Sequence, residues 1–137
     1  MHARYEVFLE NYNKTVNVEA NLMVLMANRY VLPAALSYQK EIALSVAAVR
    51  SAGGATVQGK KLLAAYSRLV DRFKVQTDAL ERLLDHNGGS AGKHAKYMRD
   101  EVIPAMNRLR QLGDEIEVLT PHEIWPLPTY REMLFVK

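Results

Sequence analysis

Apolar side chains recur at gaps of three and four residues over the stretch 17–51, which is the spacing of one face of an α-helix. The first half of this pattern consists of Ala20, Met23, Ala27, Tyr30 and Ala34, and the second of Ala35, Tyr38, Ile42, Val46 and Val49. Asn17 suits an N-cap, and Gly53 follows the last periodic position. The pattern predicts a helix about 50 Å long, which other helices must cover because so long a helix is unstable alone.

Three more helices are predicted from the same periodicity, over about 3–14, 57–86 and 91–119. The first has a face made of Tyr5, Phe8, Leu9 and Tyr12. The second has a stripe made of Leu62, Tyr66, Leu69, Phe73, Thr77, Leu80 and Leu84. The third has a seam made of Met98, Val102, Ala105, Leu109, Leu112, Ile116 and Leu119. Short loops favour antiparallel neighbours, so we expect an all-α antiparallel bundle of three long helices with a short N-terminal helix in front.

Two prolines fall inside predicted helices. Pro33 removes a backbone hydrogen bond and crowds the carbonyl of Arg29, and Pro104 does the same in the last helix. Both positions therefore predict kinks. Since each proline lies near the middle of its helix, we expect the two kinks at one height, where both helices bend together.

The segment 120–137 has no helical period. Thr120 to Glu123 and Thr129 to Glu132 have the sequence of a capping box, while two prolines keep residues 125–128 out of regular helix. We expect this tail to pack on the bundle through Trp125 and through Leu134 and Phe135.

Composition describes one folded domain over residues 1–137. Of its residues 49% are hydrophobic and 24% charged, which is typical of globular chains. The net charge of +3 comes from 18 basic and 15 acidic residues that are interleaved, unlike the basic face of a nucleic-acid binder. No apolar run approaches the length of a membrane span. The cysteine-free sequence is compatible with a reducing compartment, and we expect a cytoplasmic protein without membrane or nucleic-acid partners.

Charge along the last two long helices supports their antiparallel pairing. Each begins with basic residues and ends with acidic ones, so that folding them against each other places opposite charges together. The pattern allows the pairs Glu81–Lys96 and Lys60–Glu117. An exposed pair contributes at most about 1 kcal/mol, so this effect sets orientation more than stability.

Candidate chemistry is sparse. Residues 54–61 and 87–94 resemble phosphate loops, but each follows a helix and lacks part of the motif. The four histidines show no metal-binding spacing, although His86 and His94 flank one loop. A basic sector on the 57–86 helix is interrupted by acidic residues; it consists of Arg68, Arg72, Lys74 and Arg82. We therefore predict no catalytic, cofactor-binding or metal-binding residue in this chain.

Several sequence runs follow one another in a distinctive order. They begin with residues 4–12 and 16–20, continue with 97–100 and 104–106, and end with the most specific run, Trp-Pro-Leu-Pro-Thr-Tyr at 125–130, followed by Leu134-Phe135. This succession resembles the C-terminal region of type III glutamine synthetases. The resemblance covers essentially the whole chain. Arg131 departs from the family pattern, which has glycine after Thr-Tyr.

The resemblance implies a parent enzyme of nitrogen metabolism that joins glutamate and ammonia using ATP and Mg²⁺ or Mn²⁺, and that assembles into two-ring homo-oligomers. It places catalysis upstream of this chain, whose abrupt start in helical sequence we interpret as a piece of a longer protein. The expected function is then a non-catalytic structural or assembly role, with the catalytic domain and neighbouring subunits as partners.

Two other functions remain open from the residues. A free-standing helical interaction module would use the face around Tyr5 and Phe8 to dock on a partner. A nucleic-acid binder would need a continuous basic sector and would lose affinity steeply with salt.

Overall fold

The computed structural model describes residues 2–85 and 89–128, and the regular structure in these ranges is entirely helical. In chain order the elements are α1 (His2–Met26), η1 (Ala27–Val31), α2 (Leu32–Ser51), α3 (Val57–Leu84), α4 (Ala91–Tyr97), η2 (Met98–Val102) and α5 (Ile103–Leu119), where η marks a π-helical turn. The predicted all-α class is confirmed for the described residues.

The predicted break between a short first helix and the central helix is wrong. α1 runs without interruption through residues 15–17, because Val16 is buried on its core side and neither glycine nor proline interrupts it. Asn17 does not cap a helix; its carbonyl accepts a hydrogen bond from Asn21 Nδ2 at 2.8 Å. The first rod is therefore α1, η1 and α2 in one continuous run.

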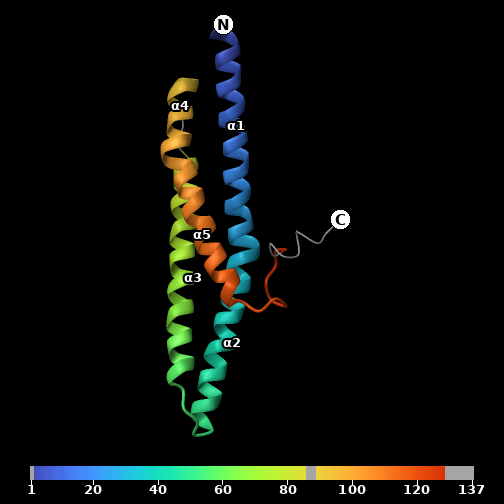
Figure 1. Cartoon of the computed structure of the whole chain (residues 1–137), viewed down its shortest axis with the longest axis vertical. Helices are drawn as coiled ribbons and strands as arrows, with labels where there is room; N and C mark the ends of the chain where they lie inside the picture. Colours follow the sequence, from blue (N-terminus) through green and yellow to red (C-terminus); the bar gives the residue numbers. More distant parts are fainter. Residues whose placement is uncertain (1, 86–88, 129–137) are drawn as a thin grey trace.

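Both prolines follow a π-helical turn. The N–H of Leu32, next to Pro33, donates to the carbonyl of Ala27, and the N–H of Ile103, next to Pro104, donates to that of Met98. These bonds span five residues instead of four, and the wider turn accommodates the proline ring where a regular turn would clash. Figure 1 shows the first rod changing direction where α1 passes into α2, as predicted for Pro33, while a kink at Pro104 stays a prediction.

The two irregular turns do not lie at one height, contrary to the prediction. Asn13 Nδ2 donates to the carbonyl of Ala91 at 3.1 Å, which fixes the level of α4 against α1. From that level Pro33 is 20 residues further along its rod, whereas Pro104 is 13 residues along the other. At 1.5 Å per residue the offset is about 10 Å, and η2 packs instead on α1 and α3.

Three rods lie side by side (Figure 1). Gln39 Nε2 donates to Ser67 Oγ at 2.8 Å and Lys74 Nζ to Asn28 Oδ1 at 3.1 Å, so α3 runs back along the first rod. Tyr97 Oη donates to the carbonyl of Leu83 at 2.7 Å and holds the start of the third rod beside the end of α3.

The core matches most of the predicted stripes. Met98 to Ile116 of the predicted seam are all buried, while Leu119 and, on the α3 stripe, Leu62 are each 38% exposed. In the first rod Tyr30 is 50% exposed, because the π turn shifts the helical register. Of the predicted first-rod stripe Ala20, Ala27, Ala35 and Ile42 are buried, and Val16, Val24 and Val31 are buried outside it.

The connections follow the expected turn chemistry. Gly53 has φ +84°, its N–H donates to the carbonyl of Arg50, and the N–H of Gly54 donates to that of Val49, which together form a Schellman motif. Ser90 caps α4 by accepting from the N–H of Lys93 at 3.3 Å, as its position predicts. Thr56 occupies the N-cap of α3 without a side-chain cap hydrogen bond.

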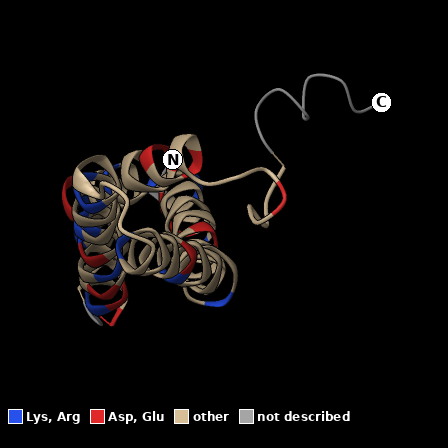
Figure 2. Cartoon of the chain, turned by 90° about the horizontal axis from the view of Figure 1, so that it is seen from below, with Lys and Arg blue, Asp and Glu red and all other residues tan. Residues whose placement is uncertain are grey.

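The predicted ion pairs between helices are absent from the described residues: neither Glu81–Lys96 nor Lys60–Glu117 forms. Ion pairs instead join neighbours on one helix, Lys74 with Asp78 at 2.9 Å and Arg99 with Asp100 at 3.0 Å. Basic and acidic residues are interspersed along the rods (Figure 2).

Candidate functional site

An open groove with a cavity volume of about 530 Å³ lies between α1, η1, α3, α5 and the first part of the tail. Its lining is mainly apolar: Leu22, Met23, Met26, Ala27, Val31, Phe73, Met106, Leu109, Gly113, Trp125 and Leu127. Unbranched methionines adapt to irregular partners, and Gly113 leaves the floor without a side chain. The groove is therefore a recess suited to an apolar segment.

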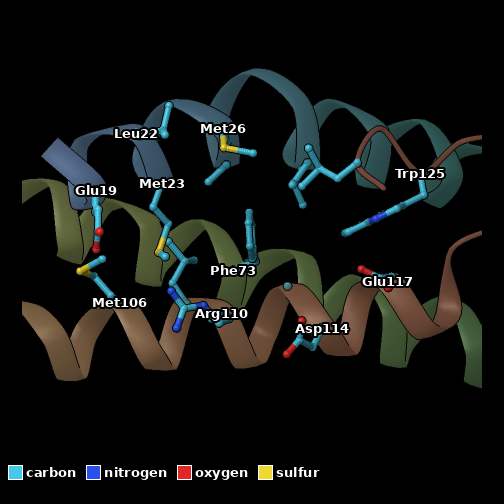
Figure 3. A pocket seen from close by; sticks show the side chains of 15 residues that line it. Glu19, Leu22, Met23, Met26, Phe73, Met106, Arg110, Asp114, Glu117 and Trp125 are labelled. Carbon is cyan, nitrogen blue, oxygen red and sulfur yellow. The ribbon is translucent and has the colours of Figure 1, made fainter. Parts of the chain in front are cut away.

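Four charged residues stand around this recess: Glu19, Arg110, Asp114 and Glu117. Figure 3 shows them at its edges, with Arg110 beside Met23 and with Trp125 reaching in from the tail. Three carboxylates against one guanidinium give the rim an acidic balance. Such a rim favours an apolar segment that carries basic residues.

Trp125 brings an unpaired donor to the groove. Its Nε1 is buried and has no hydrogen-bond partner, a condition that costs about 1–3 kcal/mol. The side chain nevertheless packs against the core, as does Leu127, so the expected docking of this part of the tail is confirmed. Leu134 and Phe135, for which the same was expected, lie outside the described residues.

The start of the tail is fixed by a buried hydrogen-bond chain. Thr120 Oγ1 donates to the carbonyl of Ile116 at 2.7 Å, so Tyr66 Oη donates to Thr120 Oγ1 at 2.8 Å. Thr120 has extended backbone angles, as expected before proline. The capping box predicted from Thr120 does not form, because its hydroxyl is used in this chain; one turn follows, in which the N–H groups of Ile124 and Trp125 donate to the carbonyl of Pro121.

Tyr66 is held in the protonated state by its surroundings. Its side chain is fully buried, and this desolvation raises the pKa of its hydroxyl above the ordinary 10.0. The hydrogen bond with Thr120 opposes this rise in pKa, and the nearby Tyr38 hydroxyl adds to it. The two rings meet edge to face, with centroids 5.1 Å apart. Through these contacts Tyr66 joins α3 to α2, at Tyr38, and to the end of α5, at Thr120.

A second feature is the side of α1 that faces away from the core, which we call the outward face. Its apolar members are Val7, Val18, Leu22 and Leu25, with 54%, 59%, 52% and 45% of their surface exposed. Exposed Arg4, Asn11 and Lys14 fall on the same helical face, which carries no acidic residue. α1 is thus apolar on two opposite sides, a pattern found where both sides of a helix are covered.

The N-terminal turns of α1 project beyond α4 (Figure 1), and residues 3–8 are all exposed. Tyr5 and Phe8, predicted as a docking face, are 63% and 65% exposed. Leu9 is only partly exposed, and Tyr12 packs against the core, so the four residues do not form one free face.

The histidines, the loop-like stretches and the basic sector named from the sequence do not form a ligand-binding arrangement within the described residues. In the described ranges no group of three or more His, Cys, Asp or Glu side chains could hold a metal ion. Residues 54–61 cross from a loop into α3, and the 87–94 stretch lies partly outside the described residues. In the basic sector, Lys74 is already bound to Asp78 and Asn28. None of the described helices is both long and apolar enough to cross a membrane.

Comparisons with known proteins show which family the chain resembles. The family profile described as "Glutamine synthetase C-terminal domain" matches residues 1–50. The type-3 glutamine synthetase of Dictyostelium discoideum is 31% identical over 151 aligned positions, which cover 100% of this chain and 20% of that protein. The glutamine synthetases of Butyrivibrio fibrisolvens and Bacteroides fragilis are 26% and 29% identical, and each alignment covers 98% of this chain and 20% of the relative.

The chain therefore belongs to the family of glutamine synthetase C-terminal domains. Within that family it is similar along its whole length to a type-3 enzyme, and it spans about one fifth of the length of these relatives.

The groove and the outward face were not found from the sequence. The signal for the outward face was present, since Val18, Leu22 and Leu25 fall between the core positions of α1. The groove had no such signal, because its walls come from three separated segments.

Proposed function

We propose that this chain is the non-catalytic C-terminal structural domain of an ATP-dependent glutamate–ammonia ligase, and that it acts in assembly. In this proposal glutamate and ammonia are joined on the catalytic domain of the full-length protein, in the cytoplasm. ATP and Mg²⁺ or Mn²⁺ belong to that domain as well. The described residues of this chain offer no carboxylate or histidine group that fits such a metal, so we derive no catalytic step on it.

The outward face of α1 carries this proposal. Fully burying a valine or leucine contributes about 1.5–3 kcal/mol, so covering the exposed half of each of its four apolar residues would contribute about 1 kcal/mol apiece. About 4 kcal/mol is enough to hold a domain on a surface to which it is already covalently linked. The relatives supply such a surface, because four fifths of their length lies outside this match.

Charge on this face favours a partner other than a second copy of α1. Arg4 and Lys14 are the charged residues on this face, and the nearest carboxylate, Glu10, lies at its edge one turn before Lys14, so pairing two copies face to face would bring mainly basic groups together. We therefore expect the covering surface to be apolar at its centre and acidic at its edge, on the catalytic domain or on a neighbouring subunit.

The same exposed residues would also serve a free-standing interaction module. The family membership supports the structural domain over this alternative, and so does the match of the whole chain to only one fifth of a longer relative.

The test compares sedimentation masses of the full-length protein that carries this chain. Val18→Asp with Leu25→Asp should convert a large assembly into smaller species, because two carboxylates would be buried in the contact. Val57→Asp is the matched control, since Val57 is 60% exposed at the start of α3 and off this face. An unchanged mass in the double variant would rule out an assembly role for this face.

A further inference from the structure

We propose that the groove is the docking site of the last nine residues of the same chain, 129–137, with their apolar side chains inserted between α1, α3 and α5. This proposal does not depend on the assembly role, because it concerns contacts within one chain.

The described chain ends at the groove. Trp125 and Leu127 already line it, and Pro128 is the last described residue. The α1 and η1 wall extends from Glu19 to Val31, about 18 Å along the helix. Nine extended residues span up to about 30 Å, so the segment can cross the recess without any movement of the helices.

The segment has the composition that the recess fits. It carries four large apolar side chains, Tyr130, Met133, Leu134 and Phe135, which match a lining of methionines, leucines and Phe73. Its two basic side chains, Arg131 and Lys137, outnumber its one acidic side chain, Glu132, so its balance of charge is opposite to that of the rim, where carboxylates dominate.

The unpaired Nε1 of Trp125 supports the same occupant. This donor is buried beside the recess without a hydrogen-bond partner. A backbone carbonyl of a segment lying in the groove would accept from it, since buried donors in folded proteins are nearly always paired.

Cross-linking within the chain tests this directly. The sequence contains no cysteine, so Leu22→Cys at the groove and Val136→Cys in the tail would be the sole thiols. A short bis-maleimide should join them within one chain. The control pairs Val136→Cys with Val118→Cys, which is 83% exposed on α5 and not part of the groove lining. We expect at least a tenfold lower yield for the control, and a loss of the Leu22 cross-link when Leu134→Asp and Phe135→Asp are added.

Equal yields for both pairs would overturn the proposal. Cross-links mainly between chains would also overturn it, because they would place the tail of a second copy in the groove.

The single tryptophan gives an independent measurement in the full 137-residue chain. Leu134→Ser with Phe135→Ser should shift the Trp125 emission to longer wavelength and increase its quenching by iodide, because the groove would open to water. Val118→Ser should change neither. Unchanged emission in the double variant, with helical content retained by circular dichroism, would show that the tail does not cover Trp125.

Discussion

The hydrogen-bond chain between Tyr66 and Thr120 gives the sharpest quantitative prediction. Tyr66→Phe removes one hydroxyl and keeps the ring packed edge to face on Tyr38. Thr120 Oγ1 still donates to the carbonyl of Ile116 in this variant. The expected loss in free energy of unfolding is therefore that of one neutral hydrogen bond, about 1 kcal/mol.

Thr120→Val should cost more than Tyr66→Phe. Valine has nearly the shape of threonine, but it cannot accept from Tyr66, whose fully buried hydroxyl would be left without its partner. The bond to the carbonyl of Ile116 is lost as well. A buried unpaired hydroxyl costs about 1–3 kcal/mol, so we expect a total loss of about 2–3 kcal/mol.

The double variant separates these effects. With both hydroxyls removed, no unpaired phenol remains, and the double variant should lose about 2 kcal/mol, which is smaller than the sum of the two single losses by about 1–2 kcal/mol. Urea unfolding followed by circular dichroism measures all four proteins. Losses that add to within about 0.5 kcal/mol would refute the coupling and with it the role of Thr120 as the partner of Tyr66.

Two further predictions concern the same rods. Burial raises the pKa of Tyr66, and unfolding restores the ordinary 10.0. The protein should therefore lose stability as the pH rises above about 10 toward the raised folded value, whereas below pH 10 this residue should not make the stability depend on pH. Denaturation curves from pH 8 to 11 should show a shallower alkaline loss in Tyr66→Phe than in the parent chain, and equal slopes in the two proteins would contradict this. Gly53→Ala should destabilise by about 1 kcal/mol, because Gly53 has φ +84° and a Cβ there meets no atom within 4 Å, so that only backbone strain acts. Gly92→Ala, in regular helix, should raise the thermal midpoint instead, and a Gly53 variant as stable as the parent would show that the loop after α2 relaxes.

The sequence was sufficient to predict the buried residues of a helix that packs against its neighbours on one side only. In the last rod, every residue that the gaps of three and four mark from Met98 to Ile116 is buried, across η2 as well, while Ala95 and Met106 are buried outside that pattern. The loop after α2 was also predictable, since Gly53 meets a local backbone requirement that needs no tertiary contact.

The first rod could not be predicted as well. A π turn ahead of Pro33 shifts the register, so the buried stripe passes through Val31 and not Tyr30. The periodicity of residues 17–51 does not contain that shift, because the extra residue per turn is a response to the proline ring. Asn17 similarly has the chemistry of an N-cap, but the burial of Val16 beside it keeps the helix continuous.

The groove depended on tertiary structure entirely. Met23, Met106 and Trp125 lie in three segments whose proximity follows from the crossing of the rods and from the anchoring of Thr120 on Tyr66. The position of each was predicted on a helix or in the tail, but no local pattern indicates that they share one recess.

The most direct test of the account is covalent footprinting of the outward face of α1 in the full-length protein. Carbene labelling read by mass spectrometry should leave Val18 and Leu25 protected, while Val57 and Val118, exposed on other elements, become labelled. Protection of the first pair alone would show that the remainder of the enzyme covers α1, as the proposed function requires. Labelling of Val18 and Leu25 as strong as that of Val57 and Val118 would contradict it, since the outward face would then be free in the assembled protein.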